Sequence, residues 1–394
     1  MRIGILTHYY NSTNYGGSLQ AYALCKALEQ MGHEAQQVCI DHSLGCYNLL
    51  DTSRLAPIKR MVGKPVKKWI KTSVRWLSPG KNKAYRMKQQ RHNTLLKAFS
   101  SFNQGMTPHS TQVYTTKNIA QAAARYDAFI TGSDQVWNPI WYFSPFFLDF
   151  VPSDKIKIAY AASIGQKTLP TYVEAVFRKH LKSFHGISVR EQDAVDLLAP
   201  LTEQPVTCVL DPTLLLSRAD WEQVCAPCQI DKPYALCYFL GDETGMRSTA
   251  QAYAKDHGLT LVNIADAAGL IHMHDRNFSD VAVKDPSVEV FLSLIRHAQY
   301  VFTDSFHASV FSLLFQRQFV VFPRSTHKAM GSRLTNLTSL FDIPERFCCC
   351  PEEEHLSYIH GLTDIDYTAM PPAFLEKKQQ SLDFLEAHLR QSGR

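Results

Sequence analysis

The chain has no long hydrophobic run. No stretch approaches the ~18 consecutive apolar residues that a membrane-spanning helix needs, which argues against an integral membrane protein. The N-terminal run MRIGILT has the length of a strand and leads at once into His8 and Tyr9, so we expect no signal peptide. These features predict a cytoplasmic protein.

The cysteines lack the pairing that a zinc site of familiar spacing requires. Of the ten cysteines, Cys225 and Cys228 form one C-x-x-C, and residues 348–350 are three consecutive cysteines. No second pair stands at a suitable distance from either group. Without a secretory signal, this cysteine content indicates reduced, buried thiols. We therefore expect no metal site.

Acidic residues are missing from one long segment. No Asp or Glu occurs in residues 52–126, while Lys and Arg crowd together in 54–91 around Trp69 and Trp76. A basic segment with aromatic residues suits an anionic membrane surface or an anionic partner. The alternative is a solvated helical excursion that packs its tryptophans onto the domain. A formal net charge of only +5 and the lack of a nucleic-acid-binding motif argue against nucleic acid as a partner.

Short apolar runs alternate with helical patterns along the whole chain, which predicts an α/β fold. A chain of 394 residues exceeds one comfortable core, and 45% hydrophobic with 20% charged residues is typical of soluble globular proteins. The pattern restarts after residue 216. We therefore predict a first domain over 1–216 with a basic insertion at about 54–91, a second over 217–372, and a helix at 373–394 that could pack back on the first domain.

The segment 300–323 reads as strand, helix, strand, and His307 stands where the first strand gives way to the helix. In open parallel sheets, ligands lie beyond the carboxyl ends of strands and beside helix N-termini. Ser305 can cap this helix, and the amides of its first turn favour an anion. His307 could bind or protonate a phosphate or carboxylate group. The plainer alternative is that His307 only caps or packs.

Four further strands are predicted at 126–131, 156–162, 186–189 and 206–210, and each ends in polar residues. Because parallel strands share one carboxyl edge, these residues are expected to converge on a site. The loop after the first strand carries two glycines that could approach a ligand or simply make a turn. The residues expected to line this site are Asn14, Tyr15, Gly16, Gly17, Ser133, Asp134, Gln135, Trp137, Asn138, Ser163, Arg190 and Asp211.

Taken together, the motifs resemble the polysaccharide pyruvyl transferase family. They are NYGGSLQAYAL at 14–24, GSDQVWN at 132–138, SVREQDAVDLL at 188–198 and TDSFHASVFSLLF at 303–315, with VLDPTLLL at 209–216 and GSRLTNL at 331–337 in the same order. The resemblance covers roughly residues 1–341. It implies two Rossmann-like domains facing across a cleft, as in GT-B glycosyltransferases.

The resemblance also implies a reaction. The enolpyruvyl unit of phosphoenolpyruvate would pass to a sugar of a polysaccharide or oligosaccharide precursor, which could be lipid-linked, giving a pyruvate ketal and phosphate without a cofactor. Arg190 matches the donor-binding arginine of the family and His307 its donor-site histidine; His307 and Asp134 are the candidate proton carriers. Relatives often carry Arg where Ser305 stands, so Arg333, or alternatively Arg324, could supply the missing cation of the donor site.

Two other functions fit the same residues. A GT-B glycosyltransferase using a nucleotide sugar would share the fold and the cleft. A catalytically inactive glycan-binding protein of an assembly complex would need the cleft but no proton carrier. The sequence alone does not distinguish these two functions from pyruvyl transfer.

Overall fold

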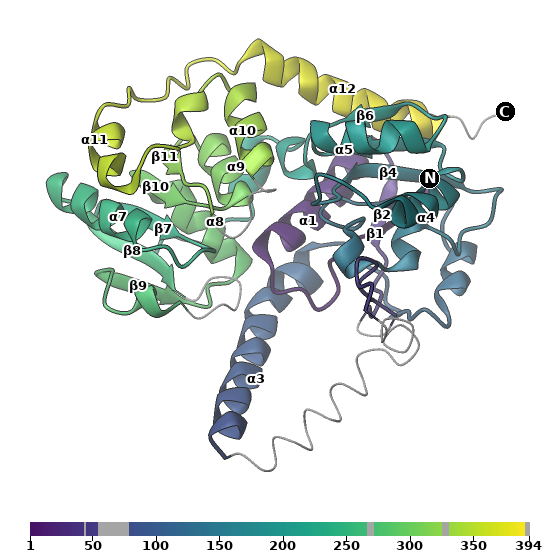
Figure 1. The fold of residues 1–394 in the computed structure, drawn as a ribbon, viewed down its shortest axis with the longest axis horizontal. Coiled ribbons are helices and arrows are strands. Elements are labelled where there is room, and N and C mark those ends of the chain that lie inside the picture. Colours follow the sequence, from purple (N-terminus) through teal and green to yellow (C-terminus); the bar gives the residue numbers. More distant parts are fainter. Residues whose placement is uncertain (43–44, 54–78, 266–271, 325–330, 391–394) are drawn as a thin grey trace.

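Two parallel sheets organise the chain (Figure 1). The computed structural model describes residues 1–42, 45–53, 79–265, 272–324 and 331–390. The first sheet has the strand order β2-β1-β3-β4-β5-β6 and the second the order β11-β10-β7-β8-β9. Helices connect successive strands of both sheets, so the predicted α/β fold with two Rossmann-like domains is confirmed.

The first sheet is formed by β1 (Arg2–Leu6), β2 (Glu34–Gln37), β3 (Ala128–Thr131), β4 (Ile156–Ala162), β5 (Gly186–Val189) and β6 (Val206–Cys208). Its main helices are α1 (Tyr15–Gln30), α3 (Pro79–Ser100), α4 (Thr171–Leu181) and α5 (Gln192–Leu198). The apolar runs that predicted β4 and β5 form the strands at those residues. Every residue of both strands is buried, as expected for a sheet covered on both faces.

The second sheet is formed by β7 (Tyr234–Tyr238), β8 (Thr260–Ala265), β9 (Val281–Lys284), β10 (Tyr300–Thr303) and β11 (Gln318–Val321). Its helices are α7 (Gly245–Asp256), α8 (Val288–His297), α9 (Phe306–Leu314), α10 (Gly331–Leu340) and α11 (His355–His360). The edge strand β9 is four residues long and only half-buried, so its residues give a weak apolar signal in the sequence, where a loop would be expected.

One predicted strand lies three residues from its expected position. We expected a strand at residues 37–40, but β2 ends at Gln37 and pairs its more polar residues with β1. The apolar run that follows packs instead against the segment that contains Tyr114, whose backbone N–H donates to Cys39 O at 2.7 Å. Val38 N still donates to Ile5 O of β1 at 2.8 Å, so the run leaves the sheet only after Val38, and burial in this second layer explains the hydrophobic pattern beyond it.

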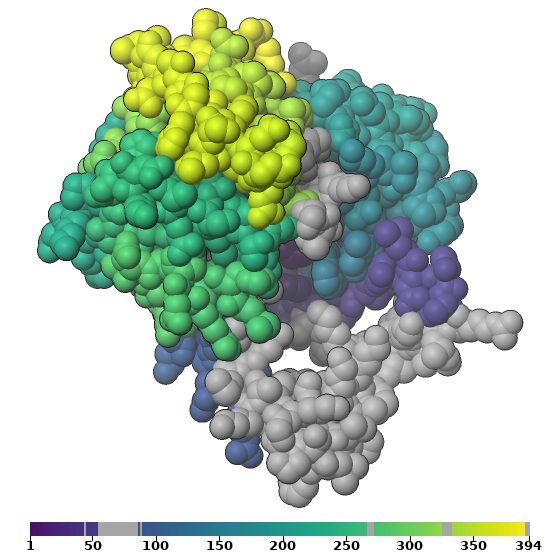
Figure 2. Space-filling model, turned by 60° about the vertical axis from the view of Figure 1, so that its left-hand side comes forward, coloured from purple at the N-terminus to yellow at the C-terminus, as the bar shows by residue number. Residues whose placement is uncertain are grey.

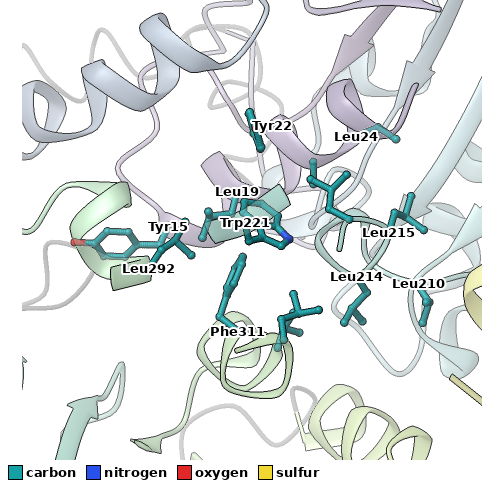
Figure 3. Close-up of a cluster of buried hydrophobic side chains, with 14 of the residues drawn as sticks. Tyr15, Leu19, Tyr22, Leu24, Leu210, Leu214, Leu215, Trp221, Leu292 and Phe311 are labelled. Carbon is teal, nitrogen blue, oxygen red and sulfur yellow. The ribbon is translucent and has the colours of Figure 1, made fainter. Parts of the chain in front are cut away.

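The two domains share one continuous hydrophobic core (Figure 3). Trp221 of α6 (Arg218–Glu222) lies between Tyr22 of the first domain and Phe311 of the second, with ring centroids 5.6 and 4.8 Å away. Tyr15 of α1 stacks on Phe291 of α8 at 4.2 Å. Buried aromatic pairs of this kind add about 0.5–1.5 kcal/mol each beyond area burial. The shared core therefore fixes the position of one sheet relative to the other.

The last helix, α12 (Pro372–Leu389), runs from the second domain over the first (Figure 1). Ser381 Oγ accepts a hydrogen bond from Leu210 N at 3.0 Å, and Phe384 packs near the ring of Tyr160. The chain thus crosses between the domains twice, once before α6 and once before α12.

The basic segment is only partly described. Residues 79–91 form the start of α3, whereas Trp69, Trp76 and the rest of 54–78 lie outside the described residues. The hypothesis of membrane association is therefore untested. In the parts of the chain that the structure describes, no helix combines the length and apolarity needed to cross a membrane.

Candidate active site

The site lies where the carboxyl ends of the two sheets face each other. In the first sheet the strand order reverses between β1 and β3, and in the second between β7 and β10. Such switch points are the ligand-binding positions of open α/β sheets. β3 delivers Ser133 and Asp134, β5 delivers Arg190, and β10 leads directly to His307. The predicted convergence of strand ends therefore occurs, and the second domain contributes to it.

His307 reaches the first domain from the first turn of α9. Ser305 caps this helix, its hydroxyl accepting from Ala308 N at 3.5 Å. The His307 ring lies against Gly16, where a Cβ atom would stand 2.1 Å from His307 Nδ1. The other ring nitrogen, Nε2, is 3.8 Å from Asp211 Oδ2. Gly16 is therefore needed for the two domains to approach each other closely. The sequence left open whether this glycine only makes a turn.

Arg190 is held in the cleft by three carboxylates. Its Nη1 donates to Asp211 Oδ2 at 2.7 Å and its Nε to Glu191 Oε1 at 3.3 Å, while Nη2 lies 3.8 Å from Asp134 Oδ1. Burial lowers the pKa of the guanidinium, but the charges of Glu191, Asp211 and Asp134 outweigh it and raise this pKa above its usual value. Arg190 is thus a fixed, permanently charged group.

Asp211 connects the cationic groups of both domains. Besides Arg190, its carboxylate accepts from Ser133 Oγ at 3.1 Å and from Thr213 Oγ1 at 2.7 Å. Burial favours the neutral acid, yet the contacts with His307, Arg190 and Thr213 hold the pKa of Asp211 well below its usual range. The residue is ionised at neutral pH and serves as the anionic anchor of Arg190 and His307.

Arg333 of α10 enters the same cleft from the second domain. Its Nε lies 3.5 Å from Glu191 Oε1, which also accepts from Ser163 Oγ at 2.8 Å. Burial and the nearby charge of Arg190 lower the pKa of Arg333 to about 10. Glu191 therefore bridges two arginines, a role that the sequence analysis missed although Glu191 stands inside one of the motifs.

Three buried nitrogens of this cluster have no hydrogen-bond partner among the described residues. They are Nη2 of Arg190, Nη2 of Arg333 and Nε2 of His307. Leaving a buried charged donor unsatisfied costs at least about 1–3 kcal/mol, so such groups usually have a partner. Two guanidinium groups with an imidazole nearby are a set of donors that suits an anion with two acidic groups.

A cavity of about 440 Å³ is lined by Arg190 and Arg333, and by Phe306, the residue before His307. The guanidinium of Arg190 lies over the ring of Phe306, 5.2 Å from its centroid, at one wall. The polar and aromatic residues of the lining are Arg190, Gln192, Asp211, Phe306, Arg333, Asn336 and Lys377. Both domains and α12 contribute, so the cavity is an interdomain site. Phe306, like Glu191, was not foreseen from sequence.

Asp134 lies beside Arg190 with a φ of +68°. Burial raises the pKa of Asp134, but the charges of Arg190, His8, His307 and Arg333 bring it below its usual value. Asp134 is therefore ionised at neutral pH and suited to accept a proton. His8, which the sequence analysis did not select as a site residue, extends this side of the cleft from the end of β1.

The surroundings of His8 differ from those of His307. Its Nε2 is 3.3 Å from Gln135 O, and its ring meets Phe146 edge-on at 4.8 Å. Burial lowers the pKa of His8, and Asp134 partly offsets this effect. Only knowledge of the fold could connect His8 with Asp134, since 125 residues of sequence separate them.

Two expected cleft residues belong to the core instead. Trp137 is 1% exposed, donates from Nε1 to Phe146 O at 3.1 Å and stacks on Phe147. The prediction that it lines the cleft was wrong, because the chain folds back and buries the indole. Tyr15 is also closed off: its hydroxyl donates to Pro286 O at 2.6 Å within the domain interface.

Several other expected residues hold the backbone near the site. Asn14 caps α1 by accepting from Gly17 N at 3.3 Å, and Asn138 accepts from Ile140 N at 3.0 Å. Gln135 Oε1 accepts from the Asn138 amide at 2.7 Å. The structure gives these side chains, like the Ser305 hydroxyl, positioning contacts within the protein.

Comparison with solved structures supports the class of fold. UDP-GlcNAc 2-epimerase from Methanocaldococcus jannaschii aligns with a TM-score of 0.52 at 9% identity, covering 98% of this chain and 100% of that one. S. aureus MnaA, solved with UDP, aligns with a TM-score of 0.50 at 12% identity, covering 99% and 96%. Two Rossmann-like domains facing across a cleft thus define a GT-B fold.

The family follows from the sequence match. The model of the polysaccharide pyruvyl transferase family matches residues 14–326, and the chain belongs to that family. A comparison with curated proteins gives no match. The matched range contains Gly16, Asp134, Arg190, Asp211 and His307, whereas Arg333 lies beyond it.

Proposed function

We propose that this protein transfers the pyruvyl unit of phosphoenolpyruvate to two hydroxyl groups of a saccharide, forming a ketal and releasing phosphate. The observation that carries the proposal is the set of three buried nitrogens, on Arg190, Arg333 and His307, that make no hydrogen bond to the part of the chain that the structure describes. Phosphoenolpyruvate presents a carboxylate and a phosphate close together. Two guanidiniums and an imidazole are the groups that would satisfy both.

The donor would be held from both domains. Nη1 and Nε of Arg190 already donate to Asp211 and Glu191, so its Nη2 would donate to the oxyanion, as would Nη2 of Arg333; a lysine has no such second nitrogen. Arg333 provides the second cation on α10, so an arginine at Ser305 is not required. The hydroxyl of Ser305 then remains the cap of α9.

The reaction needs two hydroxyl protons to be moved. A proton from His307 adds to the methylene carbon of the donor, which becomes a methyl group beside an oxocarbenium-like centre. A sugar hydroxyl attacks this centre and gives its proton to Asp134. The C–O bond to phosphate then breaks with its electron pair on phosphate, and the second hydroxyl closes the ketal. One hydroxyl proton replaces the proton that His307 gave to carbon, and the other leaves with the released phosphate.

Asp211 acts through His307 in this scheme. It lies 3.8 Å from Nε2, accepts four hydrogen bonds from the protein and is ionised at neutral pH. A buried carboxylate in this position can fix the ring and offset its charge while it carries a proton. Asp211 is therefore a positioning residue and not the proton donor.

The proposal is tested by incubating the protein with phosphoenolpyruvate and a panel of oligosaccharides, including lipid-linked precursors. We expect phosphate release that depends on acceptor, with an equal amount of acceptor gaining the mass of a pyruvate ketal. Sugar transfer from a UDP-sugar, without phosphate release from phosphoenolpyruvate, would instead identify a glycosyltransferase. Saccharide binding with no transfer from any donor would identify a non-catalytic glycan-binding protein.

A further inference from the structure

A second cluster of reactive side chains lies outside the cleft. Cys348, Cys350 and His355 each offer one atom able to bind a metal, and these three atoms all lie within 4.8 Å of one another. The two Sγ atoms are 3.5 Å apart. None of these residues lines the interdomain cavity. The cluster is thus separate from the candidate active site.

The fold brings the three residues together at the edge of the second sheet. Cys348 N donates to Val321 O at 2.9 Å, which attaches the cysteine segment to the end of β11. His355 is the first residue of α11, a helix that packs against α7. Its ring lies 5.1 Å from the ring of Phe322. In Figure 1 α11 lies on the second domain, and in Figure 2 the yellow part of the chain lies over the green second domain.

The geometry is close to that of a tetrahedral metal centre. With Zn–S bonds of about 2.3 Å, two thiolates on one zinc ion stand roughly 3.8 Å apart, and a thiolate and an imidazole nitrogen somewhat closer. The observed sulfur separation of 3.5 Å differs from this value by a few tenths of an ångström. The imidazole nitrogen lies no more than 4.8 Å from either sulfur, so a movement of the His355 ring by about 1 Å would bring all three atoms to the distances that a shared ion requires.

An independent observation also indicates a ligand at this position. Nδ1 of His355 is buried and has no hydrogen-bond partner among the described residues. A buried thiol can pack as a small apolar group without cost, but a buried ring nitrogen without a partner is unfavourable. Cys348 is wholly buried, so the cluster is not a solvated surface group.

We propose that Cys348, Cys350 and His355 bind a zinc ion, with water as the fourth ligand. Two thiolates and an imidazole favour a soft divalent ion over magnesium or calcium. Both thiols lose their protons on binding, and the two thiolates then neutralise the two positive charges of the zinc ion. The ion would tie the segment after β11 to the start of α11 and stabilise this edge of the second domain.

The proposal departs from the expectation of no metal site. The ligand pattern is C-x-C-x4-H, whereas the sequence analysis looked for a second cysteine pair. Cys225 and Cys228, the C-x-x-C of the sequence, are not part of the cluster. His355 lies five residues after Cys350, and it reaches the two cysteines because the chain turns just before α11.

The test measures zinc in the full-length protein, produced with zinc in the medium and purified under reducing conditions without chelator. Elemental analysis is expected to give about one zinc per chain, and Co²⁺ substitution should give a thiolate-to-metal charge-transfer band. Cys350→Ser and His355→Gln should each lose most of the zinc. Cys349→Ser is the matched control, since this exposed neighbour is outside the cluster, and it should retain the zinc.

A folded, reduced wild-type protein that holds less than about a tenth of a zinc per chain after dialysis against zinc would overturn the proposal. Equal zinc in the wild type and in both ligand variants would also overturn it, because the ion would then bind elsewhere. If Cys350→Ser does not fold, His355→Gln and the cobalt spectrum of the wild type still decide. A Cys348–Cys350 disulfide would contradict the site as well, and it is detected as cysteines that resist alkylation after the reduced protein is denatured with a chelator.

Discussion

His307 and Gly16 belong to different domains, yet a Cβ atom at Gly16 would lie 2.1 Å from His307 Nδ1. The imidazole therefore occupies the space that any other residue at position 16 would fill. Since Gly16 does not have a positive φ, its absence of a side chain matters here for close contact and not for backbone freedom.

Gly16→Ala is expected to displace His307 without unfolding the first domain. Misplacing a catalytic group by about 1 Å can cost on the order of a hundredfold in rate, so we expect a loss of that size in turnover. Steady-state kinetics and circular dichroism measure the two effects. Gly105→Ala is the control, because a Cβ there meets nothing within 4 Å. Normal turnover in Gly16→Ala would show that the position of His307 is not critical.

His307→Gln should reduce turnover more than it reduces donor affinity. Glutamine keeps a hydrogen-bonding amide but cannot transfer a proton at neutral pH, and the expected loss in kcat is on the order of a hundredfold or more. Single-turnover kinetics together with calorimetric titration separates the two quantities. A loss of affinity that accounts for the whole effect would make His307 an anion ligand only.

Arg333→Ala should weaken phosphoenolpyruvate binding at least about tenfold, because a charge-assisted contact with the donor is removed. Adding Ser305→Arg should restore part of the affinity from the other side of His307. Restoration should be incomplete, since the new residue also removes the cap of α9. Arg296→Ala, which breaks a pair with Glu222 elsewhere on the second domain, is the control. Unchanged affinity in Arg333→Ala would exclude it from the donor site.

Asp211→Asn should change how stability depends on pH. The pKa of Asp211 is depressed in the folded protein, so its contribution is present above the unfolded value of about 4 and is lost as pH falls below it. The free energy of unfolding of the wild type should therefore fall more steeply on acidification than that of the variant. At pH 7 the variant should be less stable by about 3 kcal/mol, because Arg190 loses a buried partner. Denaturant titrations between pH 7 and 3 test this, and parallel curves would contradict it.

The sequence predicted the fold where strands are apolar throughout and end abruptly. β4, β5 and β10 lie at the expected residues because each is a buried run followed by a polar residue. The same rule brought Ser133, Arg190 and Asp211 to one edge. It failed for β9, whose exposure alternates, and for β2, where the apolar run packs in another layer.

The rest of the site depends on the second domain facing the first. Glu191 bridges two arginines only because α10 approaches β5, and Phe306 lies beneath Arg190 only because α9 does. Neither relation leaves a local pattern in the sequence. The prediction for Trp137 was wrong because it relied on a local pattern. The polar residues at the end of β3 suggested an open cleft, but the chain folds back and buries the indole.

Calorimetric titration of the wild type and of Arg190→Lys with phosphoenolpyruvate, and with a UDP-sugar for comparison, tests the central claim most directly. Lysine keeps a positive charge, so the cluster of Asp134, Glu191 and Asp211 retains a partner, but it loses the paired donors. We predict that phosphoenolpyruvate binds the wild type, that the variant binds it at least about tenfold more weakly, and that the UDP-sugar does not compete. Binding of the UDP-sugar with no binding of phosphoenolpyruvate, or equal donor affinity in both proteins, would contradict the account.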